Sequence, residues 1–206
     1  MFARTARRVI AVSVMVVLFG TASVGCAGKG EEKNTMTPRE GRDAVVDLVI
    51  STTKQLAVTG WWPRNGPVWA DECSLGGGVL GASYSYDHWA PRGTDHTGDA
   101  RKVADYWKSL GMTVRILDQG GPVVYGSGGP VLRADFDTHA ADNSYRVGAL
   151  APCSPGDFWE LNEEDQAERD QGKVLPGDEG VIPYEQWNTP RPPTPTPEPP
   201  TDGTNS

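Results

Sequence analysis

This chain has few residues of the kinds that bind metal ions or nucleic acids. Only three cysteines and three histidines occur among its 206 residues, and no CxxC or HExxH spacing is present. Because a metal site needs three or four converging ligands, we predict neither a metal nor another cofactor. Basic side chains number 19 and acidic ones 27. Without a basic excess the chain lacks the positive surface that binds a phosphate backbone, so we expect no nucleic-acid partner.

Catalytic motifs are absent or lie in the wrong setting. Residues 51–54 have the SxxK spacing of penicillin-binding proteins, but neither KTG nor SDN follows, and the chain is too short for that fold. The glycine-rich stretches at 76–78 and 126–129 neither end in Lys-Ser/Thr nor open a helix, so we interpret them as turns and not as phosphate loops. No catalytic residue is predicted, and the chain is not expected to be an enzyme.

The N-terminal 26 residues have the layout of an export signal. A basic start with three arginines precedes an apolar stretch at 9–19, and mostly small residues fill 21–25. Cys26 follows directly. This arrangement resembles the lipobox of bacterial lipoproteins, in which the cysteine thiol receives a diacylglyceryl group and the chain is cut just before it. Ser23 stands where the lipobox prefers an aliphatic residue.

Lipidation of Cys26 predicts a protein held on the extracytoplasmic face of the cell membrane. A diacylglyceryl group supplies the two acyl chains that stable anchoring needs, at roughly 0.8 kcal/mol per buried methylene. Two alternatives stay open, because the uncharged residues 9–28 are long enough for a spanning helix and an ordinary signal peptidase would release the protein. All three place the domain outside the cytoplasm. Removal of residues 1–26 leaves 16 basic and 27 acidic side chains, a net charge of -11.

Assigning Cys26 to a lipid leaves an even pair of cysteines. In an oxidising exterior we expect Cys73 and Cys153 to form a disulfide. The bond would close a loop of 79 intervening residues, for which the chain-entropy model gives about 4 kcal/mol of stabilisation. The alternative is a pair of free, buried thiols.

Two helices are predicted from capping residues and apolar spacing. The first covers about 38–57, with Thr37 as N-cap and Glu40 completing a capping box. The second is capped by Thr97 or Asp99 and ends at Gly111, with Trp107 on its apolar face.

Alternating apolar residues predict the strands. One short strand reaches Cys73, and a second covers 79–89 in the opposite direction. Alternation returns at 112–116, 132–136 and 145–149, with a strand-like segment at 123–125. The expected fold is α+β, a mostly antiparallel sheet with two helices packed on one face, in the order α-β-β-α-β-β-β and with one disulfide.

Composition divides the chain into five parts. The part after the signal is small and charged, with a root-mean-square reach of roughly 18 Å if it is flexible. The last 18 residues contain seven prolines and nothing able to form a core. The expected parts are a lipoprotein-type signal peptide at 1–26, a flexible tether at 27–36, an α+β domain at 37–155, an acidic extension at 156–188 and a disordered Pro-rich tail at 189–206.

The order of these features resembles that of small actinobacterial envelope lipoproteins of the LppA-like kind. The likeness covers most of residues 37–155 and rests on the capped first helix, the two cysteines and the second helix. It implies an α+β sheet domain with one disulfide at the cell envelope, and it implies no known activity.

The chain is rich in tryptophan, with seven residues, and their positions suggest a function. Four of the seven gather around the first expected hairpin and form a possible binding surface, unless they serve the core: Trp61, Trp62, Trp69 and Trp89. We therefore expect a membrane-anchored binding module for a protein or glycan of the envelope. One alternative is a carrier that holds a small apolar ligand between sheet and helices. The other is a small hydrolase using a histidine-acid pair drawn from His88, His96 and His139.

Overall fold

The computed structural model describes residues 36–118 and 120–181. The signal peptide with Cys26, the tether up to residue 35, the last residues of the acidic extension (182–188) and the Pro-rich tail all lie outside the described residues. Within those two described stretches, no helix combines the length and the apolar character needed to cross a membrane.

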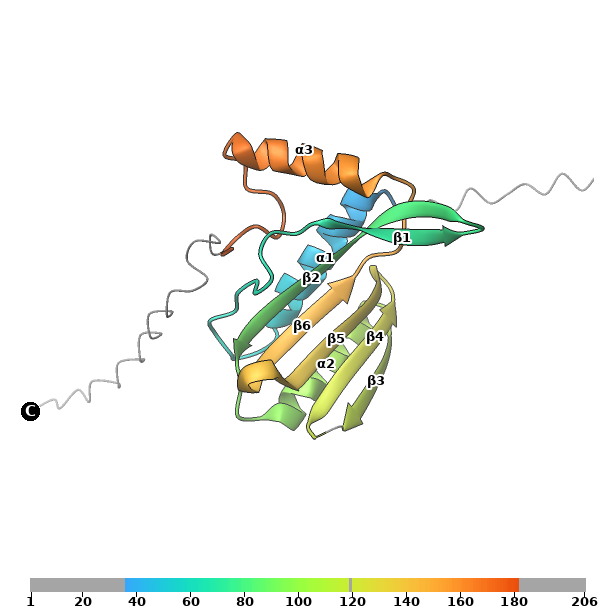
Figure 1. Ribbon diagram of the computed structural model, residues 1–206. Coiled ribbons are helices and arrows are strands. Elements are labelled where there is room, and N and C mark those ends of the chain that lie inside the picture. The colour runs from blue at the N-terminus through green and yellow to red at the C-terminus, as the bar shows by residue number, and fades with distance from the viewer. Residues whose placement is uncertain (1–35, 119, 182–206) are drawn as a thin grey trace, which may run out of the picture. The chain divides into compact units, whose positions relative to one another are not determined.

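Six antiparallel strands form one sheet in the order β1-β2-β6-β5-β4-β3. β3 to β6 form a meander, and β2 lies against β6, so the last strand joins the first hairpin to the rest of the meander (Figure 1). The strands are β1 Ala70–Gly76, β2 Val79–Pro91, β3 Thr113–Asp118, β4 Pro122–Gly128, β5 Val131–Ala140 and β6 Ser144–Leu150.

Two helices cover one face of this sheet, as expected. α1 (Pro38–Thr53) packs on β2 and β6, and α2 (His96–Ser109) packs on β3 and β4 (Figure 1). A third helix, α3 (Phe158–Asp170), packs against β1 and β2. The expected α+β class is confirmed, with one strand more than expected because the strand-like segment at 123–125 extends into the full strand β4. The acidic extension contributes all 13 residues of α3.

The ends of the first helix follow from local hydrogen bonds. The capping box is present: the Glu40 amide donates to Thr37 Oγ1 over 3.3 Å, and the Thr37 amide donates to Glu40 Oε2 over 2.8 Å. These bonds from Thr37 hold the pKa of Glu40 below its usual value. The helix ends at Thr53 and not near 57, because the amides of Gln55 and Leu56 bond to carbonyls three residues back and tighten the chain into a turn.

The second helix begins earlier than expected. Asp95 is its N-cap and accepts from the Gly98 amide over 2.9 Å. Asp99, one of the expected caps, is buried instead and accepts from the Tyr145 hydroxyl over 3.1 Å. Gly111 ends the helix region with a φ of 79°, a left-handed conformation that favours glycine.

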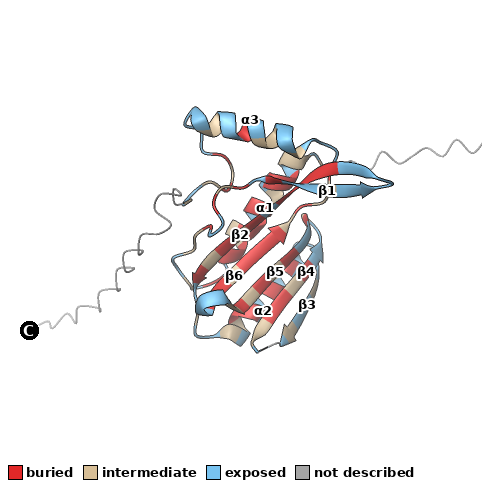
Figure 2. Ribbon diagram, in the orientation of Figure 1, coloured by how far each residue is buried: buried red, intermediate tan, exposed pale blue. Residues whose placement is uncertain are grey.

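The space between the sheet and the two helices is filled by large side chains. Among the described residues, four aromatic ones are fully buried there, with Trp107 the largest. Figure 2 shows buried residues along α1 and along the central strands β6 and β5. The Trp107 indole Nε1 donates to Thr52 Oγ1 over 2.8 Å, and Gly126 on β4 lies under its ring, where a Cβ would come within 2.9 Å. The placement of Trp107 in the core is confirmed. The other three aromatic residues are Tyr84, Phe136 and Tyr145.

The expected disulfide is also confirmed. Cys73 and Cys153 are bonded, with their Cα atoms 5.8 Å apart. Cys73 lies within β1, while Cys153 lies in the segment after β6, three residues beyond the strand end. Beside it, Ser154 and Ala82 exchange two backbone hydrogen bonds of 2.9 Å each. The disulfide and this backbone pair together attach the segment after β6 to the first hairpin.

Candidate functional site

The face of the sheet opposite to α1 and α2, here called the open face, carries polar side chains. Along β2, buried Tyr86 is flanked by exposed Ser85 and partly exposed Asp87, since neighbouring side chains of a strand point to opposite faces. The register places Asp87 beside Gly148 of β6, and Gly148 beside Asp135 of β5. The open face thus brings together groups from three strands.

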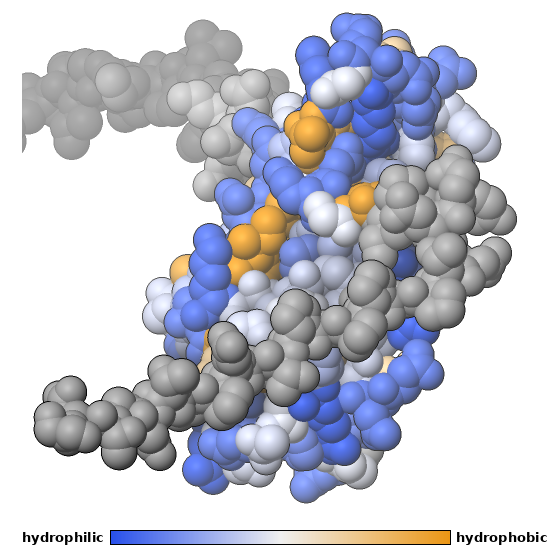
Figure 3. All heavy atoms as spheres, turned by 90° about the vertical axis from the view of Figure 1, so that its left-hand side faces the viewer, coloured by the Kyte–Doolittle hydropathy of each residue, from blue (hydrophilic) through white to orange (hydrophobic). Residues whose placement is uncertain are grey.

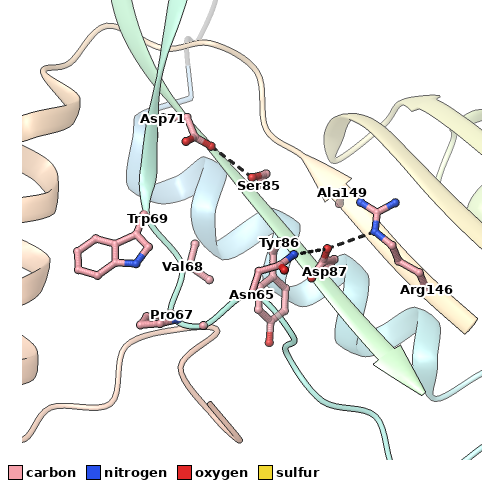
Figure 4. Close-up of a pocket in the computed structure, with 11 residues that line it drawn as sticks. Asn65, Pro67, Val68, Trp69, Asp71, Ser85, Tyr86, Asp87, Arg146 and Ala149 are labelled. Atoms are coloured by element: carbon pink, nitrogen blue, oxygen red, sulfur yellow. Dashed lines mark hydrogen bonds and ion pairs between the residues drawn. The ribbon is translucent and has the colours of Figure 1, made fainter. Parts of the chain in front are cut away.

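Arg146 of β6 joins two carboxylates on the open face. Its Nε donates to Asp87 Oδ2 over 3.2 Å, and its Nη1 donates to Asp135. Asp87 also accepts from the Asn65 side-chain amide over 2.9 Å (Figure 4). Gly148 leaves room for the guanidinium, because a Cβ there would lie 2.7 Å from Arg146 Nη2. Burial raises the pKa of Asp135 above its ordinary value, although the positive charge of Arg146 opposes this shift.

A hollow of about 350 Å³ lies next to this network. It is lined by the chain segment 65–69, by Asp71 of β1, by Ser85 and Asp87 of β2, and by Arg146 (Figure 4). The Ser85 hydroxyl donates to Asp71 Oδ2 over 3.3 Å. The lining therefore offers two carboxylates, an amide, a hydroxyl, a guanidinium and an indole within one small volume.

Of the four tryptophans singled out in the sequence, Trp69 lines this hollow. Its side chain is 38% exposed, and the guanidinium carbon of Arg169 lies 4.5 Å from the ring centroid. Arg169 is itself fixed by two hydrogen bonds to the Asp178 carboxylate, of 2.8 and 3.1 Å. The ring of Trp69 is thus held in place by α3 and by the chain that follows it.

The other three tryptophans lie elsewhere. Trp62 and Trp89 exchange two backbone hydrogen bonds of 2.9 Å. The Trp89 ring also stacks under Arg64, whose guanidinium carbon is 4.6 Å from the centroid. Trp61 packs against the core and donates to the Val58 carbonyl over 2.9 Å. The structure brings Trp62 and Trp89 together and places Trp69 at the hollow.

A second hollow of about 580 Å³ lies on the open face over β3, β4 and β5. Its charged lining residues are Arg115, Arg133 and Asp135, and the Arg115 guanidinium lies 5.0 Å from the Tyr125 ring centroid. Asp135 thus borders the Arg146 network on one side and this hollow on the other. Both hollows lie on the face opposite to the helices. The carrier hypothesis, which places a small apolar ligand between the sheet and the helices, stays a prediction.

The three histidines occupy separate environments. His88 points to the helix side, with Nε2 2.6 Å from the Tyr86 hydroxyl, and burial lowers its pKa. His96 Nε2 donates to the Gly93 carbonyl over 2.8 Å, while His139 Nδ1 lies 3.0 Å from the carboxylate of Asp137. Within residues 36–118 and 120–181, no three His, Cys, Asp or Glu side chains are placed to hold a metal ion.

The residues of the Arg146 network were not identified from the sequence. Asp87 and Arg146 are 59 positions apart, and Asn65 is 22 positions before Asp87. The one available signal was the alternation of polar and apolar residues along β2, which marks Asp87 as facing away from the core. It does not indicate which strand lies beside β2.

No family model matches this chain, and no curated protein matches it significantly. Among solved structures, a DUF4853 family protein from Actinomyces odontolyticus is 15% identical, with a TM-score of 0.41, and the match covers 74% of this chain and 76% of the other. The structure of Ara h 8.0201 is also 15% identical, with a TM-score of 0.14 and coverage of 66% and 84%. At these scores neither likeness carries an argument, and the LppA-like resemblance stays a prediction.

Proposed function

We propose that this protein is a lipid-anchored binding module on the extracytoplasmic face of the cell membrane, and that its open face binds a neutral glycan of the cell envelope. The export signal ending at Cys26 supports the location. The bond between Cys73 and Cys153 supports it as well, because disulfides persist in oxidising compartments outside the cytoplasm.

The lining of the smaller hollow is the observation that supports a glycan as the ligand. Sugar hydroxyls donate to carboxylates such as Asp71 and Asp87, and the amide of Asn65 can donate and accept. The exposed indole of Trp69 offers an apolar surface of the kind that stacks on a sugar ring. A volume of about 350 Å³ is within the range of small-ligand sites, and suits one or two sugar units.

Charge favours a neutral glycan over an acidic one. The hollow contains two carboxylates and one guanidinium, and Arg146 is already paired with Asp87 and Asp135. The chain without residues 1–26 has a net charge of -11. An anionic polymer would be repelled by this surface. Hydrophilic residues also dominate the side of the molecule seen in Figure 3, where hydrophobic residues appear only in small groups.

Anchoring is tested at Cys26. Replacing Cys26 with alanine is expected to abolish both the diacylglyceryl modification and the cut before residue 26, because the thiol that carries the acyl chains is lost. The wild-type protein should release the mass of a diacylglyceryl-modified N-terminal peptide on digestion. A wild-type protein that is found in the membrane fraction, keeps residues 1–25 and carries no diacylglyceryl mass would instead favour a spanning helix at 9–28.

Glycan binding is tested at Trp69. Trp69→Ala is expected to weaken binding of neutral envelope-glycan fragments about tenfold, a loss of about 1.4 kcal/mol, because the stacking surface is removed. Calorimetric titration of the purified protein gives the Kd. Trp159→Ala is the matched control, since it removes another exposed tryptophan, at 68% exposure on α3. Equal affinity in both variants, or no binding by the wild type, would reject a glycan as the ligand. Crosslinking of a protein to the open face in cells would then identify a protein partner instead.

A further inference from the structure

Three of the nine exposed large hydrophobic side chains of the described residues lie at the tip of the first hairpin. Residues 73–86 contain no charged side chain. Within the hairpin tip, residues 74–80, three glycines are flanked by Leu75, Val79 and Leu80, which are 39%, 56% and 59% exposed. The hairpin projects beyond the rest of the sheet, and its end is exposed (Figures 1 and 2). An exposed, uncharged aliphatic tip on an acidic domain indicates an interaction site for an apolar partner.

The aliphatic side chains lie on both faces of this ribbon. Leu80 is opposite Ser74 and shares its face of β2 with the core residue Ala82. Leu75 lies on the other face, since a Cβ on Gly81 would come within 3.1 Å of its side chain. A protein partner would cover one face of the ribbon. A lipid phase would surround the ribbon and cover both of its faces.

The hairpin lies at the end of the domain where the described chain begins. A Cβ on Gly156 would lie 3.0 Å from Pro38 Cγ and 3.9 Å from Ala82 Cβ, so the first residue of α1 is close to the base of the hairpin. Figure 1 shows the start of α1 beside this base. Ten residues, 27–36, separate Cys26 from the start of the domain, and ten residues span at most about 35 Å. The hairpin tip is therefore within reach of the leaflet that would hold the lipid.

We propose that the hairpin tip inserts into the surface of the membrane that carries the lipid anchor, with Leu75, Val79 and Leu80 in contact with acyl chains. The inference rests on the proposed lipid anchor and adds a second membrane contact to it. Insertion is shallow, because the outer edges of a two-stranded ribbon leave backbone groups that need water. Trp159, which is also exposed, lies in the first turn of α3, three residues after Gly156.

The test uses the mature lipidated protein in vesicles of phosphatidylcholine and phosphatidylglycerol that contain a lipid with a photoreactive diazirine in its acyl chain. After illumination, mass spectrometry maps the lipid adducts. We expect adducts to concentrate in the hairpin tip. Combining Leu75→Ser, Val79→Ser and Leu80→Ser should lower adducts in this segment at least tenfold. The matched control combines Leu132→Ser and Val174→Ser, which remove exposed aliphatic side chains elsewhere, and should leave the adducts unchanged.

The outcomes separate this inference from the anchor itself. Vesicle-bound protein with adducts spread evenly, or absent from the tip, overturns the inserted hairpin and leaves the anchor intact. Wild-type protein that does not associate with vesicles overturns the anchor. A tip that crosslinks to another protein in cells, and not to lipid, also overturns the inference. Thermal unfolding of each variant checks that it is folded. If the triple variant is unstable, the positions of the lipid adducts on the wild-type protein decide whether the hairpin tip inserts.

Discussion

Replacing Asp165 with alanine is expected to lower the free energy of unfolding by about 3–5 kcal/mol, the usual cost of breaking a buried ion pair. The Asp165 side chain is 1% exposed on α3 and accepts from Arg42 of α1 over 3.3 and 3.4 Å. It also accepts from Arg39 over 3.0 Å and from the Tyr84 hydroxyl over 3.1 Å. Without it, the buried Arg42 guanidinium keeps the exposed Asp43 carboxylate, 3.2 Å from its Nε, but loses its buried ionic partner.

A neighbouring carboxylate provides the matched control for this experiment. Glu164 pairs with Arg39 over 2.8 Å but is 55% exposed, so Glu164→Ala is expected to cost at most about 1 kcal/mol. Denaturant unfolding of both variants gives the two free energies. Burial, with the charge of Asp165 second, raises the pKa of Tyr84 to about 12, so this hydroxyl remains a donor at neutral pH. Equal losses in the two variants would contradict a stabilising role for the buried cluster.

Replacing Cys73 and Cys153 together with alanine is expected to cost about 4 kcal/mol. The bond joins residues 80 positions apart, and removing it frees the unfolded chain from a long closed loop. Denaturant unfolding of the double variant, compared with the wild type, measures the loss. The wild-type protein without residues 1–26 should have no free thiol.

Hydrogen exchange separates the two effects of this bond. Faster exchange confined to the base of the hairpin would reflect local loosening, because the backbone pair between Ala82 and Ser154 remains in the variant. Faster exchange throughout the sheet would reflect lost global stability. A change below about 1 kcal/mol would mean that the bond contributes little beyond the packing around it.

The parts of the fold that depend on neighbouring residues were predictable. The capping box at Thr37 and Glu40, the glycine at 111 and the buried Trp107 are signals within a few residues of the structure they specify. The Cys73–Cys153 bond was predictable for another reason, since assigning Cys26 to lipid leaves one possible pair. These signals fixed the fold class without any knowledge of which strands are neighbours.

The candidate site and α3 depended on distant partners. Asp87 and Arg146 meet only because β2 lies beside β6, a pairing that no local pattern indicates. α3 has no continuous apolar stripe, and its only buried residue is the charged Asp165. Hydrophobic periodicity therefore does not indicate this helix, because ionic contacts to α1 hold it as well as apolar ones.

The position of β6 determines when this protein can fold. Residues 144–150 pair with β2 on one side and β5 on the other, so a chain lacking them has a two-stranded hairpin and a separate three-stranded meander. An isolated hairpin is marginally stable in water, and the unpaired edge of β2 would attract other strands. The sheet therefore cannot close until residue 150 has been made, and truncation before that point gives two incomplete halves. Truncation near 182 leaves all six strands of the sheet in place.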